Sequence, residues 1–362
     1  MKIIEIMPIF ELCGVTRFVT DLCNQFVERH EVVLIVFYPT PSSRQPELSS
    51  RVKLLELGKE PGLSPMLCQR LRTVLQQEKA DVVHIHTASA LQYAALAILT
   101  VRTSRYYYTL HSEAKFEIPS RLGRKLVECT LLRPGVCQTI SPSAFVANSL
   151  SFATPLIPLG RDLREEQRVD ATAAQQMADI RNRHNGQILL NVSNLTPVKN
   201  QLMLCRAVLE LLEKGYNIEL VLIGNAPDDA YFQKLMPLLR HERIHYIGAR
   251  NKIPAYMVEA DFFCLSSITE SGPLVLIEAF FAGLIPICTP CGDVPNKIRH
   301  GDNGLCADDC SVRAYKAVLE EALNLPESRR RSMSEAAGQS YPAYSMESCA
   351  AQYIKLFQRH SA

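Results

Sequence analysis

The sequence predicts an α/β fold with two doubly wound domains. Short apolar runs rich in Val and Ile alternate with amphipathic helical segments along nearly the whole chain, the pattern of parallel sheets covered by helices. This alternation stops once, in a charged stretch at 160–176, and then restarts. A length of 362 residues allows about two domains. We therefore expect Rossmann-like domains at 1–160 and 161–340 that face each other across a cleft, and a final helical segment at 341–362 that crosses back to the first domain.

The first domain begins with an apolar run at its N-terminus and continues as a βα series. Helices are predicted where apolar residues recur at helical spacing, and strands where short apolar runs lie between turn residues. The predicted strands are 2–7, 32–38, 52–57, 81–85, 105–110, 136–140 and 156–158. The predicted helices are 15–29, 65–78 and 88–102. Such alternation favours a parallel sheet.

The second domain repeats the same series after the charged stretch. Its predicted strands are 187–192, 218–223, 244–247, 260–265 and 285–288. Its predicted helices are 200–214, 231–240, 273–283, 312–323 and 327–339. A last helix at 345–360 places Cys349, Tyr353 and Phe357 on one face, so we expect that face to be buried.

Composition describes an ordinary folded core. The chain is 47% hydrophobic with a net charge of +2, which gives no general attraction to nucleic acid. No apolar run reaches the ~18 residues of a membrane span, and the run at 2–10 is too short for a secretory leader. The twelve cysteines lie mostly in apolar runs, as expected of free thiols in a reducing compartment. We therefore expect a cytoplasmic protein.

The stretch 266–283 has the pattern of a strand end, a turn and a helix start. Ser271 and Gly272 form the predicted turn, an apolar helix follows from Pro273, and Gly283 is placed to end it. The start of a helix offers unpaired N–H groups and a positive dipole end, which together can bind a phosphate. Glu270 and Glu278 flank this helix start. A buried carboxylate is costly unless it is paired, so Glu278 either has a neighbouring partner or serves a ligand.

The two glutamates support a family assignment. Their spacing, followed by Ala279 and Gly283, resembles the E-x7-E signature of the group-1, GT4-like retaining glycosyltransferases. The resemblance implies the GT-B fold and a hexosyltransferase of class EC 2.4. It implies transfer of a sugar from a nucleotide-sugar donor, most simply a UDP-sugar, to a glycan or lipid-linked acceptor with retention of configuration. We expect a role in bacterial surface polysaccharide or lipopolysaccharide biosynthesis.

Other segments resemble the same family. The stretch 191–200 is similar to the family's strand-loop motif, in which Lys199 takes the position of a phosphate-binding lysine and Ser193-Asn194 replaces Gly-Arg. The stretch 108–111 resembles a T-x-H segment, so His111 is expected near the scissile bond. Gly14 fits the second glycine of a Gly-Gly loop, with Cys13 in place of the first. Because cysteine adopts positive φ only at a cost, Cys13 is either extended or the loop differs.

The resemblance assigns roles residue by residue. Glu270, His111 and Lys199 are the expected catalytic residues. The residues expected to bind the donor are Lys199, Asn194, Ser271, Gly272, Leu274, Val275, Glu278 and Gly14. Among them, backbone amides around Gly272 and Leu274 hold the phosphates, Glu278 takes the ribose hydroxyls and Glu270 the sugar hydroxyls. No cofactor and no metal are expected, because a lysine and a helix dipole supply the positive charge.

Three departures from the family pattern motivate an alternative. Asn194 lacks the charge of the usual arginine, Cys13 replaces a glycine, and Asn296 stands near the position of a usual glutamate. The alternative is a catalytically weakened sugar-nucleotide sensor or assembly partner. An inverting transferase of the same fold is also compatible with the sequence.

Two patterns admit metal sites, and one admits a lipid surface. Cys288, Cys291, Cys306 and Cys310 have zinc-like spacing, although buried thiols are the simpler interpretation. His84 and His86 alternate on one strand face and either pair on a metal or line the interior. The segment 115–133 interleaves basic with apolar residues, so it is either a peripheral membrane contact or a solvated helix face.

Overall fold

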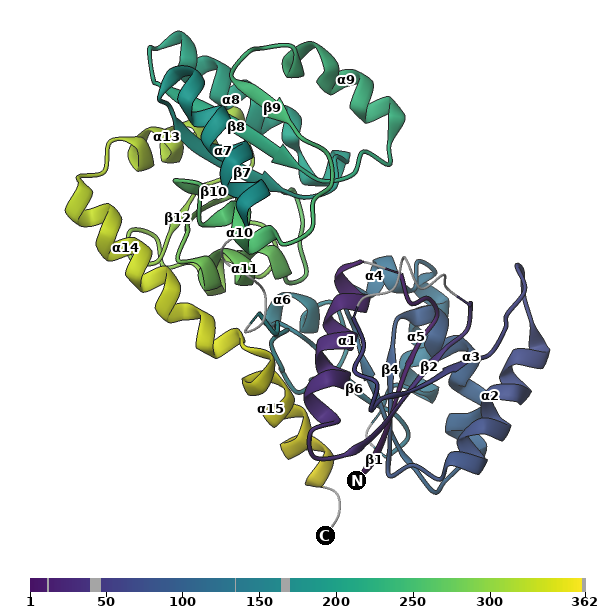
Figure 1. The fold of residues 1–362 in the computed structure, drawn as a ribbon. Helices are drawn as coiled ribbons and strands as arrows, with labels where there is room; N and C mark the ends of the chain where they lie inside the picture. The colour runs from purple at the N-terminus through teal and green to yellow at the C-terminus, as the bar shows by residue number, and fades with distance from the viewer. Residues whose placement is uncertain (12, 40–46, 134, 164–169, 360–362) are drawn as a thin grey trace. The chain divides into compact units, whose positions relative to one another are not determined.

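The computed structural model describes residues 1–11, 13–39, 47–133, 135–163 and 170–359. These residues form two compact units, one comprising Met1–Asp162 with Ser345–Ala362 and the other Leu163–Tyr344 (Figure 1). The domain limits expected at 160 and 340 lie two residues before Asp162 and four before Tyr344. Each unit is an α/β sandwich with its own parallel sheet.

The N-terminal unit contains a six-stranded sheet in the order β3-β2-β1-β4-β5-β6. Its strands are β1 (Lys2–Met7), β2 (Glu31–Val36), β3 (Lys53–Glu56), β4 (Val82–His86), β5 (Arg105–Thr109) and β6 (Gln138–Ile140). All neighbouring strands pair in parallel. The strand expected at 156–158 was wrong, because Leu156 forms only an isolated bridge to Ser141. Pro155 precedes this segment and Pro158 ends it, and both lack the N–H donors that a ladder needs.

Helices cover both faces of this sheet (Figure 1). They are α1 (Gly14–Phe26), α2 (Pro65–Glu78), α3 (Ala88–Thr100), α4 (Ala114–Glu117), α5 (Arg121–Thr130), α6 (Ala144–Ala147) and α15 (Met346–Gln358). One core contains apolar residues of α2 and α3 with alternate strand residues such as Ile4, Val83 and Ile85. Successive strand residues point to opposite faces, so Glu5, His84 and His86 point to the other face.

The last helix, α15, packs on that other face. The Phe357 ring lies 6.1 Å from Phe26 of α1 and 4.6 Å from Tyr107 of β5, measured between centroids. The Tyr353 hydroxyl and the Thr109 hydroxyl are 2.9 Å apart. The C-terminal helix therefore completes the core of the N-terminal unit.

The C-terminal unit contains a second six-stranded parallel sheet, in the order β12-β11-β10-β7-β8-β9. Its strands are β7 (Gln187–Val192), β8 (Ile218–Ile223), β9 (Ile244–Tyr246), β10 (Phe262–Leu265), β11 (Ile285–Cys288) and β12 (Leu305–Cys306). Its helices are α7 (Ala171–His184), α8 (Gln201–Glu213), α9 (Asp229–Leu239), α10 (Ile253–Met257), α11 (Leu274–Ala282), α12 (Val294–Lys297), α13 (Val312–Leu323) and α14 (Glu327–Ser340). Two short 3₁₀ segments are η2 (Pro197–Lys199) and η3 (Tyr341–Tyr344).

Two segments differ from the sequence prediction for local reasons. The charged stretch 160–176 is not a linker throughout, because α7 begins at Ala171. Its N-cap Asp170 accepts hydrogen bonds from the N–H groups of Thr172 and Ala173. The basic segment 115–133 is broken into α4 and α5 at Pro119, and Ser120 caps the second helix. Among the described helices, none is both long and apolar enough to cross a bilayer.

Each sheet reverses its strand order at one place. Strand order changes direction between β1 and β4 in the N-terminal unit, and between β7 and β10 in the C-terminal unit. In open parallel sheets, ligands bind beyond the carboxyl ends of the strands at such a switch point. The loops after β1, β4, β7 and β10 are therefore the places to search for a site.

Candidate active site

The loops after β7 and β10 bring two predicted site residues together. Lys199 ends the 3₁₀ turn η2, and Glu270 lies in the turn after β10. Their side chains form an ion pair with 2.5 Å between Nζ and Oε1. The two loops are also joined by a backbone hydrogen bond from the N–H of Ile268 to the carbonyl of Val198. The side chains of Glu270 and Lys199 are 12% and 29% exposed, so both can reach a ligand.

Buried hydroxyl groups fix the geometry of this pair. Ser267 donates to Glu270 Oε1 at 2.8 Å, and Ser266 donates to the carbonyl of Lys199 at 2.7 Å. Thr289, after β11, donates to the carbonyl of Ser267 at 2.6 Å. All three hydroxyl residues are buried, so the loops hold the pair without relying on solvent. The serines around the turn thus have a structural reason for their positions.

The loop after β11 packs directly on the Glu270 turn. Gly292 has φ +54°, and a Cβ there would lie 1.5 Å from the carbonyl oxygen of Glu270. Only glycine avoids both the backbone strain and the clash. Farther along, Asn296 donates to Asp293 at 2.9 Å, and Asp293 pairs with Lys297. Asn296 therefore belongs to a side-chain network at the start of α12.

Helix α11 begins beside this turn. Pro273 is its N-cap, with ψ 109°, rather than its first helical residue as expected. Proline has no side-chain acceptor, so it leaves the first N–H groups of Leu274 and Val275 for another partner. Glu278 lies within the helix and is 6% exposed. The turn at Ser271 and Gly272 leads into this positive helix end, an arrangement that suits a phosphate.

Asn194 does not replace the charge of an arginine. Its side-chain oxygen accepts from the N–H of Asn225 at 3.4 Å, after β8. Gln201 donates to the Asn194 carbonyl and to the Ser193 hydroxyl, which holds the β7 loop. A Cβ at Gly224 would lie 2.0 Å from the Ser193 carbonyl oxygen, so these two loops are in close contact. In this unit Lys199 is therefore the predicted site residue that supplies positive charge.

In the N-terminal unit, the predicted residue His111 joins a buried polar cluster. His111 follows β5, and its Nε2 is 2.9 Å from His86 Nδ1. His86 Nε2 is in turn 2.6 Å from Glu5 Oε2. His84 Nδ1 forms its hydrogen bond with the other carboxylate oxygen, Glu5 Oε1, at 3.3 Å. The sequence pattern indicates the three histidines but not Glu5, because a single carboxylate in an apolar strand carries no signal of its partners.

Burial controls the charges in this cluster. It lowers the pKa of His84, His86 and His111 to about 3 each, so the imidazoles are neutral at pH 7. Burial raises the pKa of Glu5, while its hydrogen bond from His86 opposes the rise. The edge of the Phe18 ring lies against His86 and His111.

The loop after β1 resolves an open question of the sequence. Cys13 is the N-cap of α1 with φ −147°, which is ordinary extended backbone and needs no glycine. Gly14 is the first residue of the helix and is exposed. The substitution of Cys for the first glycine is therefore compatible with the loop.

The structure also bears on the two possible metal sites. Among the described residues, the only group of three or more potential ligands within 4.8 Å of one another is Glu5, His84 and His86. The four cysteines at 288, 291, 306 and 310 are free thiols and do not form such a group. Their separation among the described residues, together with the burial of Cys288 and Cys291, favours the interpretation as buried thiols.

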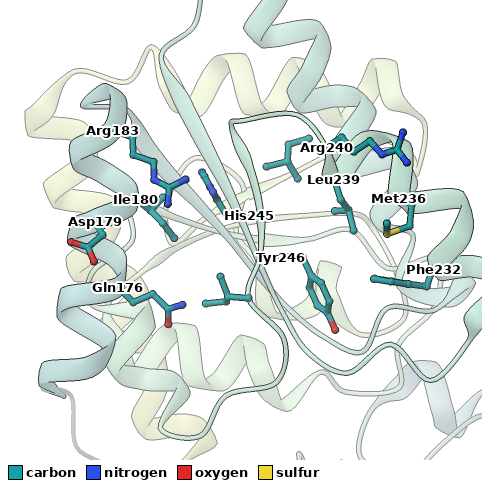
Figure 2. Close-up of a pocket in the computed structure, with 12 residues that line it drawn as sticks. Gln176, Asp179, Ile180, Arg183, Phe232, Met236, Leu239, Arg240, His245 and Tyr246 are labelled. Carbon is teal, nitrogen blue, oxygen red and sulfur yellow. The ribbon is translucent and has the colours of Figure 1, made fainter.

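One further pocket was not indicated by any sequence motif. It measures about 560 Å³ and lies along the edge strand β9, between α7 and α9 (Figure 2). Arg183, Arg240, Phe232 and Tyr246 are among its lining residues. None of the predicted site residues lines it. Its residues come from β9 and from faces of α7 and α9 whose sequence pattern resembles that of any solvated helix.

The fold and the two switch-point loops define the class of the molecule. Two six-stranded parallel sheets with flanking helices match the architecture of GT-B glycosyltransferases. The solved structure of Anabaena HepE in complex with UDP has this fold, with a TM-score of 0.82, 16% identity, and coverage of 99% of this chain and 100% of that one.

Family models match both halves of the chain. The model described as glycosyl transferases group 1 matches residues 173–339, and the model of glycosyltransferase family 4 matches residues 13–158. The chain therefore belongs to the family 4 type of GT-B glycosyltransferases, which are hexosyltransferase enzymes.

Two curated relatives are similar over much of their length. The N-acetyl-alpha-D-glucosaminyl L-malate synthase of Bacillus anthracis is 26% identical over 80% of this chain and 78% of its own. The UDP-Gal:alpha-D-GlcNAc-diphosphoundecaprenol alpha-1,3-galactosyltransferase of Escherichia coli is 25% identical over 59% of each chain. This family thus includes relatives in bacterial glycan biosynthesis.

Proposed function

We propose that the chain transfers a hexose from a UDP-sugar to a glycan or lipid-linked acceptor with retention of configuration, in bacterial surface polysaccharide or lipopolysaccharide biosynthesis. The observation that carries this proposal is the Lys199–Glu270 ion pair beside the start of α11. The relatives point to the same chemistry: the Escherichia coli enzyme is named for a UDP-sugar donor and a lipid-linked acceptor, and HepE was also solved with UDP-glucose.

The pair suits the charges that develop in sugar transfer. A nucleoside diphosphate leaving group gains negative charge while the sugar becomes positive, so cations and N–H dipoles at the phosphates lower the barrier. Lys199 and the amides of Ser271, Gly272, Leu274 and Val275 supply that positive charge. Glu270 accepts from sugar hydroxyls, and Glu278 accepts from ribose hydroxyls.

Neither a cofactor nor a metal ion is part of this proposal. The positive charge at the phosphates comes from Lys199 and from the helix dipole of α11. Transfer should therefore continue at the same rate after dialysis against EDTA. A loss of activity that Mg²⁺ or Mn²⁺ restores would contradict this part.

The test begins with thermal unfolding in the presence of UDP, GDP and ADP. A ligand at 100 times its Kd stabilises the folded protein by about 2.7 kcal/mol, so the matching nucleotide should raise the Tm by several degrees. UDP is the expected match. Lys199→Ala should remove most of this shift, while Lys234→Ala, which changes an exposed lysine of α9, should keep it. No shift with any nucleotide would contradict the proposal.

The second step tests whether the protein releases or transfers a sugar. The protein is incubated with UDP-hexoses and UDP-N-acetylhexosamines, and release of sugar to water or to a lipid-linked glycan is followed by mass spectrometry. The anomeric configuration of a transferred sugar is read by NMR, and retention is expected. UDP binding without any sugar release or transfer would favour the sensor alternative, which Asn194 motivates because it contributes no charge to the β7 loop.

We also propose that α4 and α5 rest on an anionic lipid surface at the inner face of the membrane, where a lipid-linked acceptor resides. Phe116, Leu122 and Leu126 are 58%, 80% and 64% exposed, which is unusual for large apolar side chains. Lys115, Arg121 and Lys125 lie on the same two helices. Apolar residues among basic ones are typical of interfacial helices. The proposal places the protein in the cytoplasm.

A further inference from the structure

A continuous line of hydrogen bonds runs through the N-terminal unit from His111 to α15. It passes from His111 to His86, then to Glu5, His84 and Thr109, and ends at the Tyr353 hydroxyl. Apart from His111, which is 6% exposed, every member is fully buried. None of these side-chain atoms is among the buried polar atoms that lack a partner. The line is therefore a buried network in which the position of each proton constrains the next.

The arm of this line that runs from Glu5 through His86 to His111 fixes the tautomers of both histidines. If Glu5 is ionised, Oε2 accepts a hydrogen bond from His86 Nε2–H across 2.6 Å. A neutral imidazole carries one N–H, so His86 Nδ1 is then bare and accepts from His111 Nε2–H across 2.9 Å. His111 has its single proton on Nε2, and its Nδ1 is a hydrogen-bond acceptor. Among the described residues, the structure gives Nε2 of His111 a partner and gives none to Nδ1.

The other arm, which runs from Glu5 through His84 and Thr109 to Tyr353, is also consistent with a negative charge on Glu5. His84 Nδ1 donates to Glu5 Oε1 across 3.3 Å, which leaves His84 Nε2 to accept from the Thr109 hydroxyl at 2.7 Å. Thr109 can then accept from Tyr353 at 2.9 Å. The two imidazoles thus each place an N–H on one oxygen of the carboxylate, as two donors do toward an acceptor that has no proton of its own.

The hydrogen bonds in the arm to His111 reverse their direction only if Glu5 is protonated. A protonated Glu5 would donate to His86 Nε2, which would place the His86 proton on Nδ1 and make Nε2 of His111 an acceptor. The charge of one carboxylate thus decides whether His111 offers an acceptor or a donor at Nδ1. The other groups that face Glu5 are Cys23 of α1 and Tyr353 of α15, and neither brings a formal charge.

We propose that Glu5 is a positioning residue that acts through His86 to hold His111 as the Nε2–H tautomer, so that Nδ1 of His111 accepts a hydrogen bond from a sugar hydroxyl of the substrate. The role in sugar binding rests on the proposed transferase function. The tautomer itself does not, because it follows from contacts within one unit of the chain.

The first test measures the tautomer in the ligand-free protein. The chain is labelled with ¹⁵N-histidine, and long-range ¹H–¹⁵N NMR separates protonated from bare ring nitrogens. Loss of signals in His111→Gln assigns the residue. We expect a neutral His111 with its proton on Nε2. A proton on Nδ1 in the unmodified protein would overturn the proposal, and this measurement needs no variant of Glu5 that folds.

The second test compares two variants of the same network. Glu5→Gln keeps the shape but removes the charge, so the two His111 nitrogen signals should exchange or average. Tyr353→Phe is the matched control, because it removes one buried hydroxyl from the opposite arm and leaves the arm to His111 intact. It should leave the His111 signals unchanged. Identical His111 signals in Glu5→Gln and the unmodified protein would overturn the proposal.

Transfer kinetics test the role in sugar binding. Loss of one well-aligned hydrogen bond in the transition state corresponds to about a tenfold loss in kcat. Glu5→Gln and His111→Gln should both show this loss, and Tyr353→Phe should stay near the unmodified rate. Full activity of His111→Gln would overturn the sugar contact, and the NMR result would show separately whether the tautomer holds. Sugar transfer by the unmodified protein shows beforehand that the proposed function itself is right.

Metal analysis tests whether Glu5, His84 and His86 bind a metal ion instead. A metal on Glu5, His84 and His86 would take the lone pair of His86 Nε2 and leave the His86 proton on Nδ1, which reverses the arm. We expect the purified protein to contain no stoichiometric metal, and addition of Zn²⁺ to leave the His84 and His86 signals unchanged. A bound metal at one equivalent that shifts both sets of signals would overturn the proposal.

Discussion

Glu270 accepts two hydrogen bonds through a single oxygen, from the Lys199 ammonium and the Ser267 hydroxyl. Glu270→Gln keeps the shape and one acceptor but removes the charge that a sugar hydroxyl and Lys199 both use. We expect transfer to fall by about 100-fold, the scale for losing one preorganised electrostatic contact. The pair is partly exposed, so the free energy of unfolding should change by no more than about 1 kcal/mol.

The measurement is the transfer rate with UDP-sugar at saturation, together with urea unfolding. Glu213→Gln is a suitable control, because Glu213 is an exposed carboxylate at the end of α8 in the same unit. It should leave both quantities unchanged. A Glu270→Gln protein that turns over at the rate of the Glu213 variant would remove Glu270 from the mechanism.

The buried histidines should make the N-terminal unit sensitive to acid. Their pKa values are lowered from 6.5 to about 3 in the folded chain, so below pH 6.5 the unfolded chain binds protons that the folded chain does not. Stability therefore falls as pH falls from 6.5 toward 3, by up to about 1.4 kcal/mol per pH unit for each histidine. The raised pKa of Glu5 works in the opposite direction and offsets part of the loss below its folded value.

Hydrogen-exchange mass spectrometry of β4 peptides near pH 7 and pH 5 checks this expectation, after correction for the intrinsic pH dependence of exchange. Protection of β4 should drop at the lower pH. Peptides of β8 in the C-terminal unit give an internal comparison. That strand also carries a buried carboxylate, Glu219, which pairs with His184 and His245. Equal protection of β4 at both pH values would show that these histidines are not neutral in the folded state.

At the scale of elements, the site depends on close contact between the loops after β10 and β11. Gly292→Ala combines the cost of φ +54° with a Cβ placed 1.5 Å from the Glu270 carbonyl oxygen, so one loop must move. Gly215→Ala is the matched control, since φ there is +92° but no atom lies within 4 Å of the added Cβ. We expect the control to lose about 1 kcal/mol and the Gly292 variant at least twice that.

Nucleotide binding separates the two glycine variants further. Displacement of the Glu270 turn should weaken UDP binding by about tenfold or more in Gly292→Ala, while Gly215→Ala should bind normally. Calorimetry measures both. Equal UDP affinity in the two variants would mean that the β11 loop does not position the site.

The lipid surface proposed for α4 and α5 has its own test. Arg124 donates to the backbone carbonyl of Ile118, so it has a structural role and is kept. The double change Arg121→Gln and Lys125→Gln removes two exposed charges, each worth about 1 kcal/mol at an anionic surface. Binding to phosphatidylglycerol-containing vesicles should weaken by about 30-fold, with no change on purely zwitterionic vesicles.

The control for this test removes the same charge elsewhere on the unit. Arg29→Gln with Arg102→Gln changes two exposed arginines after α1 and α3. If both double variants lose vesicle binding equally, the attraction is general rather than local. If neither loses it, α5 is an ordinary solvated helix.

At the scale of the molecule, hydrophobic alternation predicted most elements, because burial on both faces leaves a clear apolar run. The strands Lys2–Met7, Gln187–Val192, Ile218–Ile223 and Ile285–Cys288 have the predicted bounds. Helix α7 was missed, because its charged N-terminal neighbours obscured a start that depends on the cap at Asp170. Family resemblance indicated Lys199 and Glu270, yet their ion pair joins residues 71 apart and arises only from the sheet order.

The N-terminal unit depends on α15, a helix that follows the C-terminal unit in the sequence. Helix α15 buries Met346, Tyr353, Leu356 and Phe357 among its own unit's residues. Full burial of such side chains contributes roughly 1.5–3 kcal/mol each, so their sum approaches the whole stability of a domain. A chain ending at Tyr344 should therefore lose the cooperative unfolding of its N-terminal unit, while the unit Leu163–Tyr344 keeps its own transition.

Differential scanning calorimetry of three proteins tests this dependence. The chain ending at Tyr344 is compared with residues 163–344 alone and with a chain ending at Gln358, which keeps all of α15. The Gln358 chain should unfold like the full protein, and the Tyr344 chain should show only the transition of residues 163–344. Because Thr109 also loses its hydroxyl partner Tyr353, the buried network should open with the helix. Two unchanged transitions in the Tyr344 chain would show that the sheet with α1, α2 and α3 is a sufficient core, and that α15 is an addition to a unit already stable without it.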